Sequence, residues 1–166
     1  MKLIQLTLAA LFLPLGLAAC SGEGDPLAQI DEGFAALNSG DAAHAHDYFL
    51  AAVDELEPTD PNLDRAQMGL VEAKIRIQPE AAAKYFLDYA GKQPANVDAG
   101  DYQKVGMQLT DKKALKDAVF VLDAGLKRFE GDAKLKEAIE KTKLAAESSG
   151  DAGALDALKG LGYVGD

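Results

Sequence analysis

The fold is decided by residues 33–58, which read GFAALNSGDAAHAHDYFLAAVDELEP. Four residues of this stretch return 36 positions later: Gly33, Ala45, Phe49 and Pro58 are echoed by Gly69, Ala81, Tyr85 and Pro94. A weaker third copy, 37 positions further on, contains Gly106, Ala118 and Leu122, with Gly131 near the place of the proline. A period of this length indicates stacked supersecondary units, none of which can bury its apolar face alone. The pattern predicts a solenoid of helical hairpins.

Apolar residues at helical spacing and helix-breaking turns divide the rest of the chain. Ile30, Phe34 and Leu37 recur at i, i+4 and i+7, which places them in one stripe on a helix. No alternation of useful length indicates a strand, so the sequence predicts an all-α fold. The predicted helices cover residues 26–38, 42–56, 61–77, 79–90, 97–109, 112–129 and 133–147. The first six form three hairpins, and the last, rich in Lys and Glu, is predicted to cap the solenoid.

The small and large residues of the first hairpin resemble those of the tetratricopeptide repeat. In that family a glycine in the first helix and an alanine in the second allow close approach, as Gly33 and Ala45 would. Phe49 resembles the large residue before the final turn, and Pro58 the terminating proline. The chain has no Trp, has Glu32 where a leucine is expected, and exceeds the family's period of roughly 34 residues. The resemblance implies degenerate repeats; an unrelated helical bundle is the alternative.

The first 19 residues have the form of a secretory signal. Lys2 is followed by a mostly apolar run from Leu3 to Leu17, which is shorter than the roughly 18 residues that a membrane span needs. Cys20 is the only cysteine and directly follows Leu17-Ala18-Ala19, which resembles the lipobox of bacterial lipoproteins. The resemblance implies that Cys20 is acylated and becomes the mature N-terminus. Ordinary cleavage, which would leave a free thiol on a soluble exported protein, is the alternative.

The same resemblance implies a place in the cell. Ser21 follows the cysteine, and by the sorting rule of Gram-negative lipoproteins this is similar to an outer-membrane address facing the periplasm. Residues 20–25 would form a short acylated tether, and the domain of residues 26–147 would sit close to its membrane.

The charge of the chain bears on its partners. The formal net charge is −10, and removing a signal that contains Lys2 leaves 27 acidic and 16 basic side chains. Nucleic acid is excluded as a partner, because phosphate binding needs clustered Lys and Arg. Anionic lipid would also repel this domain, so the N-terminal lipid is expected to hold it at the membrane. Solubility alone is the simpler explanation of the acidity.

The sequence offers no candidate catalytic or metal site. His44 and His46 are the only histidines, and two positions on a helix point about 200° apart, too far to share one metal ion. With Cys20 taken by lipid, neither a Ser-His-Asp nor a Cys-His set can be assembled. Residues 160–165 match GxGxxG, but the motif needs a strand before it and a helix after it. We expect no enzyme activity, metal or cofactor.

A candidate groove comes from the tetratricopeptide resemblance. In that family the first helix of each repeat lines a concave groove that receives a partner. The residues that fall there are Ile30, Phe34, Leu37, Ala66, Leu70, Ala73, Gln103, Met107 and Thr110. Phe34, Leu70 and Met107 occupy equivalent positions, so an apolar stripe would cross three units. The alternative is that these helices are rotated and the stripe belongs to the core.

Residues 148–166 are predicted to form a hinge and a short tail. Five large apolar residues fall within ten positions: Leu155, Leu158, Leu161, Tyr163 and Val164. Monomeric proteins rarely expose such a segment, so we expect it to dock, either against Leu135 and Ile139 or on a partner. Its ending resembles short C-terminal tails of exported bacterial sulfatase-like and repeat proteins, and no function transfers with that likeness.

Together these features predict a membrane-anchored lipoprotein of the cell envelope that binds a protein or peptide. A helix or an extended segment laid across an apolar groove is the expected mode. A passive structural subunit of an envelope complex, or a small-molecule-binding accessory of a transporter, are the alternatives. An exposed apolar patch in the groove would favour binding, and a filled groove would favour the structural role.

Overall fold

The computed structural model describes residues 24–164, which fold into α-helices and one short 3-10 helix. The signal sequence, Cys20 and the start of the tether lie outside the described residues. The elements are α1 (Pro26–Ser39), α2 (Ala42–Glu55), α3 (Leu63–Ile77), α4 (Pro79–Lys92), η1 (Pro94–Asn96), α5 (Ala99–Asp111), α6 (Leu115–Arg128), α7 (Ala133–Ser149) and α8 (Ala152–Gly160). No strand occurs between residues 24 and 164, and the predicted all-α class is confirmed.

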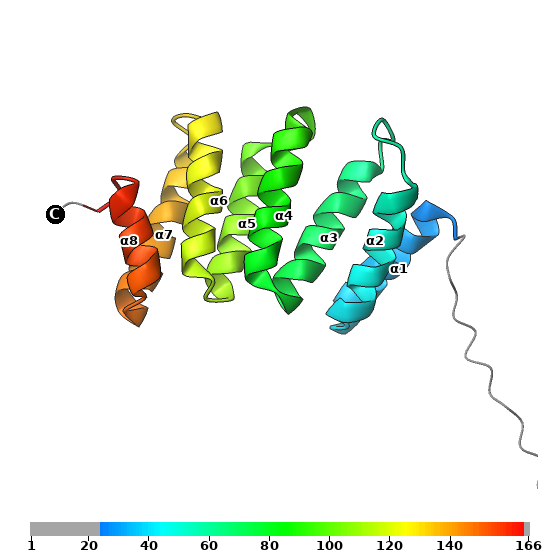
Figure 1. The fold of residues 1–166 in the computed structure, drawn as a ribbon, viewed down its shortest axis with the longest axis horizontal. Coiled ribbons are helices and arrows are strands. Elements are labelled where there is room, and N and C mark those ends of the chain that lie inside the picture. The colour runs from blue at the N-terminus through cyan, green and yellow to red at the C-terminus, as the bar shows by residue number, and fades with distance from the viewer. Residues whose placement is uncertain (1–23, 165–166) are drawn as a thin grey trace, which may run out of the picture.

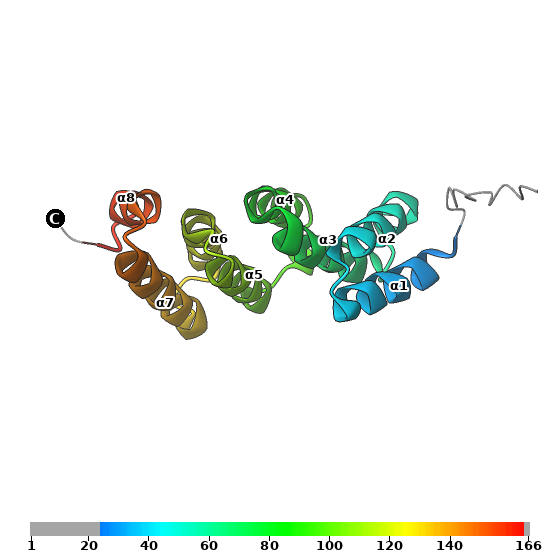
Figure 2. The same cartoon turned by 90° about the horizontal axis from the view of Figure 1, so that it is seen from below.

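The helices pack as consecutive hairpins in a single row, as the solenoid prediction requires (Figure 1). The odd-numbered helices form one layer and the even-numbered helices the other (Figure 2). In the same view α3 and α5 are set back from α1 and α7, so the layer of odd-numbered helices is concave. Only neighbouring units contact one another extensively, which is the defining property of a solenoid.

Aspartates begin most of these helices. The Asp41 carboxylate accepts a hydrogen bond from the backbone N–H of His44 at 3.2 Å, and Asp25, Asp132 and Asp151 cap α1, α7 and α8 in the same way. Such caps satisfy backbone donors that have no partner inside the helix. Part of the acidity of the chain therefore fixes where its helices start.

The repeated glycines make room for one phenylalanine. Phe49 of α2 is fully buried, and a Cβ atom on Gly33 of α1 would lie 2.8 Å from its ring. A Cβ on Gly69 of α3 would lie closer still. The ring of Phe49 thus fits between two helices that carry no side chain at the contact, and it joins the first hairpin to the second.

The second unit is displaced by one residue from the predicted register. Ala81 is exposed, whereas Ala82 and Phe86 are fully buried and occupy the places of Ala45 and Phe49. The prediction that Ala81 lies at a helix contact is therefore wrong. Its physical cause is the start of α4 at Pro79, which lies 37 positions after the start of α2.

The tail belongs to a fourth hairpin, so residues 133–147 are not a lone capping helix. Ala154 and Leu158 of α8 are fully buried and lie 36 positions after Ala118 and Leu122 of α6. Thr142 of α7 stands 36 positions after Gly106. Residues 148–151 form the turn of this hairpin, where Gly150 adopts a left-handed φ of 68°.

The core has two parts that meet at α3. Ala66, Leu70 and Ala73 of α3 pack with α1 and α2 around Phe49. Val71 and Ile75 of the same helix belong to a larger cluster that continues through α4–α8. α3 is therefore buried on two sides and connects the first hairpin to the rest of the solenoid.

Candidate functional site

The predicted apolar groove is part of the core. Ile30 and Leu70 are fully buried and Leu37 is 3% exposed, because all three point between the two layers. Of the two alternatives drawn from the sequence, these residues therefore fit a stripe that belongs to the core and do not line an open groove. Spacing along the sequence identified the stripe, but only the rotation of the helices decides which way it faces.

Phe34 and Met107, the other members of the stripe, are half-buried and covered. The ring of Phe34 meets that of Phe49 edge to face, with centroids 4.9 Å apart. The guanidinium of Arg65 lies 5.1 Å above the Phe34 centroid and pairs with Asp31 at 2.7 Å. Met107 packs against the larger core cluster. The concave layer therefore offers no continuous apolar surface in the described part of the chain.

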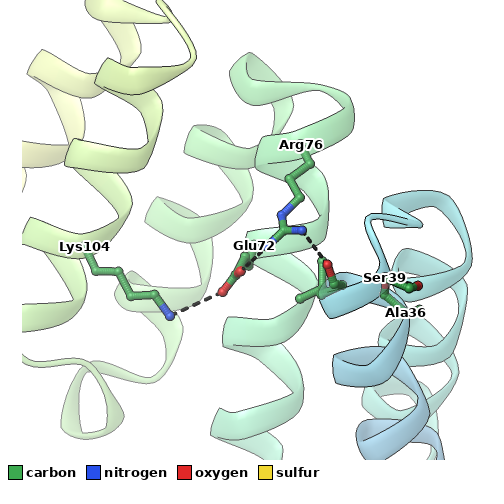
Figure 3. Close-up of polar contacts among 6 residues, drawn as sticks. Ala36, Ser39, Glu72, Arg76 and Lys104 are labelled. Atoms are coloured by element: carbon green, nitrogen blue, oxygen red, sulfur yellow. Dashed lines mark hydrogen bonds and ion pairs between the residues drawn. The ribbon is translucent and has the colours of Figure 1, made fainter.

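The concave layer instead carries a chain of polar contacts across three hairpins (Figure 3). Arg76 of α3 binds Glu72 at 2.7 Å and donates to the carbonyl oxygen of Leu37 in α1, also at 2.7 Å. Lys104 of α5 reaches the second oxygen of Glu72 at 3.4 Å. Because these charges are satisfied within the protein, we assign them to holding neighbouring hairpins in register.

A cleft on the first hairpin has a different character. It lies between α1 and α2 and encloses about 470 Å³. Its lining residues are Gly24, Ala28, Gln29, Glu32, His44, Asp47, Tyr48 and Ala51. The side of this hairpin that faces α3 carries Phe34 and Phe49, so the cleft opens on another side of α1 and α2. The sequence reasoning missed this cleft, because its residues form no motif.

Gln29 gives the cleft an unfulfilled hydrogen-bonding group. The residue is 7% exposed, and its amide nitrogen donates to the carbonyl oxygen of Gly24 at 3.3 Å. That bond fixes the orientation of the amide, because the reverse orientation would bring two acceptors together. The amide oxygen is then the buried side-chain polar atom that lacks a partner among residues 24–164. Such a group costs folding free energy until a donor reaches it.

Charge is distributed very unevenly along the solenoid. Residues 21–64 contain 11 Asp and Glu and no Lys or Arg, whereas residues 65–166 contain 16 of each kind. The formal net negative charge of residues 21–166 therefore falls on residues 21–64, which contain the first hairpin. This asymmetry could have been read from the sequence, and it marks the hairpin that also holds the cleft.

The two histidines of α2 are engaged separately. The Nδ1 atom of His44 lies 2.6 Å from the Asp41 carboxylate, and this contact raises the pKa of His44 and lowers the pKa of Asp41. His46 contacts Asp47 at 3.2 Å through Nδ1 and Lys74 of α3 at 3.1 Å through Nε2. Among residues 24–164 no group of three or more His, Cys, Asp or Glu side chains could hold a metal ion.

The predicted docking tail packs on its own solenoid. Leu158 is fully buried, and Leu161, Tyr163 and Val164 are half-buried against the larger core cluster. The hydroxyl of Tyr163 donates to Oδ1 of Asp123 in α6 at 3.0 Å. α8 thus contacts α6 as well as α7, where Leu135 and Ile139 lie.

Residues 160–165 do not form a phosphate-binding loop within the part that the structure describes. Gly160 ends α8, and Gly162 adopts a φ of 83° so that the N–H of Tyr163 can reach the carbonyl oxygen of Leu158 at 2.9 Å. The glycines of this segment terminate a helix instead of opening one.

Two further findings bear on function. None of the helices in residues 24–164 combines the length and the hydropathy needed to span a bilayer. Comparison of the chain with protein-family models, with curated proteins and with solved structures gave no match.

Proposed function

We propose that the protein is a lipid-anchored scaffold of the bacterial cell envelope that binds another protein through its first hairpin. The repeats are degenerate tetratricopeptide units, and Cys20 carries the lipid on an outer membrane facing the periplasm. The protein has no catalytic activity of its own. Its helices position a binding surface at a fixed short distance from the membrane.

The observation that carries this proposal is the unsatisfied cleft of the first hairpin. The hairpin buries its apolar side against α3, yet the amide oxygen of Gln29 finds no partner among residues 24–164 and lies in the cleft that Glu32 and Asp47 also line. A purely structural subunit that stacks through acidic faces would have to overcome repulsion between like charges. A partner that brings positively charged hydrogen-bond donors to the cleft pairs with the amide oxygen and reduces the repulsion among the carboxylates.

The membrane position supports the same conclusion. Gly24, which lines the cleft, lies four positions after Cys20. At ~3.4 Å per residue this connection spans at most about 14 Å. A protein bound at the cleft would therefore lie close to the membrane surface.

Replacement of the cysteine tests the anchor. Cys20→Ala should move the protein from the membrane fraction to the soluble exported fraction. Sedimentation of the variant with membranes after a high-salt wash would contradict the lipoprotein assignment.

Site-specific photocrosslinking in cells tests the binding surface. Ala28 lines the cleft and Ala81 is an exposed alanine on α4, so the pair offers matched positions for a photoreactive phenylalanine. We expect a discrete crosslinked protein from position 28 and none from position 81. Equal products from both positions, or none from position 28, would contradict binding at the first hairpin.

A further inference from the structure

We infer that the cleft between α1 and α2 receives a lysine or arginine side chain from a basic segment of the partner protein. This inference rests on the proposed function and specifies the chemistry of the partner. It combines the unpaired amide oxygen of Gln29, the carboxylates that line the cleft and the charge of the first hairpin.

The lining of the cleft is rich in acceptors. Glu32 contributes an exposed carboxylate, and Gln29 contributes its buried amide oxygen. Asp47 accepts from His46 through Oδ1 only. A guanidinium or ammonium group carries several donors and no acceptor, so it matches this set better than a neutral or anionic group.

Among residues 24–164, the basic side chains nearest the cleft are engaged elsewhere. The basic residue nearest in sequence, Arg65, is held by Asp31 and the ring of Phe34. Lys74 lies against His46 and the ring of Tyr85. His44, at the edge of the cleft, is engaged by Asp41. We therefore assign the positive charge to the partner.

The ring of Tyr48 and the negative charge around the cleft also favour a cationic side chain. Tyr48 lines the cleft and is 36% exposed, and the face of a tyrosine ring attracts a cation. The 11 acidic residues at positions 21–64 surround the cleft with a negative potential that attracts basic segments from a distance. An anionic membrane surface is excluded by the same charge.

The test uses a labelled peptide in which arginine alternates with glycine, and an analogue in which uncharged citrulline replaces arginine. Fluorescence anisotropy with the purified protein should show binding of the arginine peptide at least about tenfold tighter than that of the citrulline peptide, weakening as salt rises from about 0.05 to about 0.3 M. Equal binding of the two peptides would overturn the inference.

Matched charge variants separate the cleft from general attraction. Glu32→Gln with Asp47→Asn removes two charges from the cleft, and Glu55→Gln with Glu57→Gln removes two exposed charges elsewhere near the same hairpin. The cleft pair should weaken binding by about tenfold and the control pair by less than about threefold. Equal weakening would show non-specific attraction and would overturn the proposed site.

Replacement of the buried amide gives an independent readout. Gln29→Met should weaken binding of the peptide by about tenfold. It should leave the unfolding temperature unchanged or higher, because it removes a buried acceptor that has no partner among residues 24–164. Unchanged peptide affinity would overturn the role of Gln29. Calcium binding is the competing outcome and is measured by titration with calcium chloride. If calcium binds the parent protein but not the variant Glu32→Gln with Asp47→Asn, and the peptide still binds that variant, the cleft is a metal site and the inference is overturned.

Failure of this inference can be distinguished from failure of the proposed function. If the arginine peptide does not compete with the crosslink from position 28, the partner binds there by other chemistry and only the inference falls. If position 28 gives no crosslink, the proposed function itself falls.

Discussion

The two ends of the solenoid differ in how completely they are closed. At the C-terminal end, α8 buries Leu158, and Tyr163 ties the tail to Asp123 of α6. At the N-terminal end, Leu27 is 44% exposed and the amide oxygen of Gln29 has no partner in the described residues. α8 thus has the features of a structural cap, although Leu144 of α7 is 62% exposed. For the N-terminal end, the proposed function supplies a partner as the cover.

The ends differ equally in charge. Residues 21–64, which contain the first hairpin, have no Lys or Arg, whereas the later hairpins balance acidic and basic side chains. The Lys127–Asp123 pair, at 2.7 Å, lies within α6, whereas Asp31 of the first hairpin pairs with Arg65 of α3. The first hairpin therefore depends on the next one for a Lys or Arg partner.

The largest effect is expected from shortening a leucine at each end. Leu158→Ala should lower the free energy of unfolding by ~2–5 kcal/mol, because it removes a fully buried side chain. Leu27→Ala should change it by no more than ~0.5 kcal/mol, because Leu27 is already largely in water. Denaturant titrations measure both. A similar loss at the two ends would remove the distinction between a closed and an open end.

Two neighbouring alanines of α4 test which of them lies in the packed core between the two ends of the solenoid. Ala82→Leu should cost ~1–3 kcal/mol through overpacking, because Ala82 is fully buried. Ala81→Leu, one residue away and exposed, should cost less than ~0.5 kcal/mol. Thermal or chemical unfolding compares the two variants. The opposite order would restore the register read from the sequence.

Ionisation of Tyr163 tests whether the C-terminal tail is held against α6. Burial and the bond to Asp123 raise the pKa of Tyr163 to about 12, above the value of about 10 for an unfolded tyrosine. The resulting stabilisation is complete below about pH 10 and is lost as the pH rises toward the folded pKa. Tyr163→Phe should cost ~0.5–1.5 kcal/mol at neutral pH and should remove this alkaline loss.

Spectrophotometric titration measures that ionisation directly. The titration curve of Tyr163→Phe should lack one phenol, and the missing phenol should be one that ionises above about pH 10 in the parent protein. If the missing phenol is one that ionises near pH 10, the tail is not held against α6.

The smallest effect is expected at the exposed pair of the first hairpin. Asp41 raises the pKa of His44, so its stabilisation is complete below about pH 6.5 and is lost as the pH rises through the raised folded value. Proton NMR should place the midpoint of His44 above about 6.5. Asp41→Asn, which keeps a capping side chain, should bring the midpoint back toward that value. An unchanged midpoint would show that the carboxylate does not act on His44.

The sequence was sufficient to predict the hairpins, because glycine and alanine mark helix contacts directly. It predicted one hairpin too few, because Thr142 stands in the glycine position of the last unit. That residue is tolerated because its hydroxyl bonds the carbonyl oxygen of Ala138 at 2.9 Å and lies 2.8 Å from the hydroxyl of Thr110. A polar residue in the place of a small one conceals the repeat.

The candidate groove could not be settled from spacing. An apolar stripe at i, i+4 and i+7 fixes one face of α1, but the direction of that face depends on how α1 rests on α2 and α3. The cleft was harder still to predict. Gln29 is an ordinary polar residue in the sequence, and only its burial without a hydrogen-bond partner gives it significance.

The sharing of Phe49 between two hairpins also has a consequence for the order of folding when the chain emerges N-terminus first. α1 and α2 come out before α3, but the ring of Phe49 has no second wall until Gly69 of α3 arrives. The end of α3 at Ile77 follows the end of α2 at Glu55 by 22 residues. The packing of the first hairpin is therefore completed only by its neighbour.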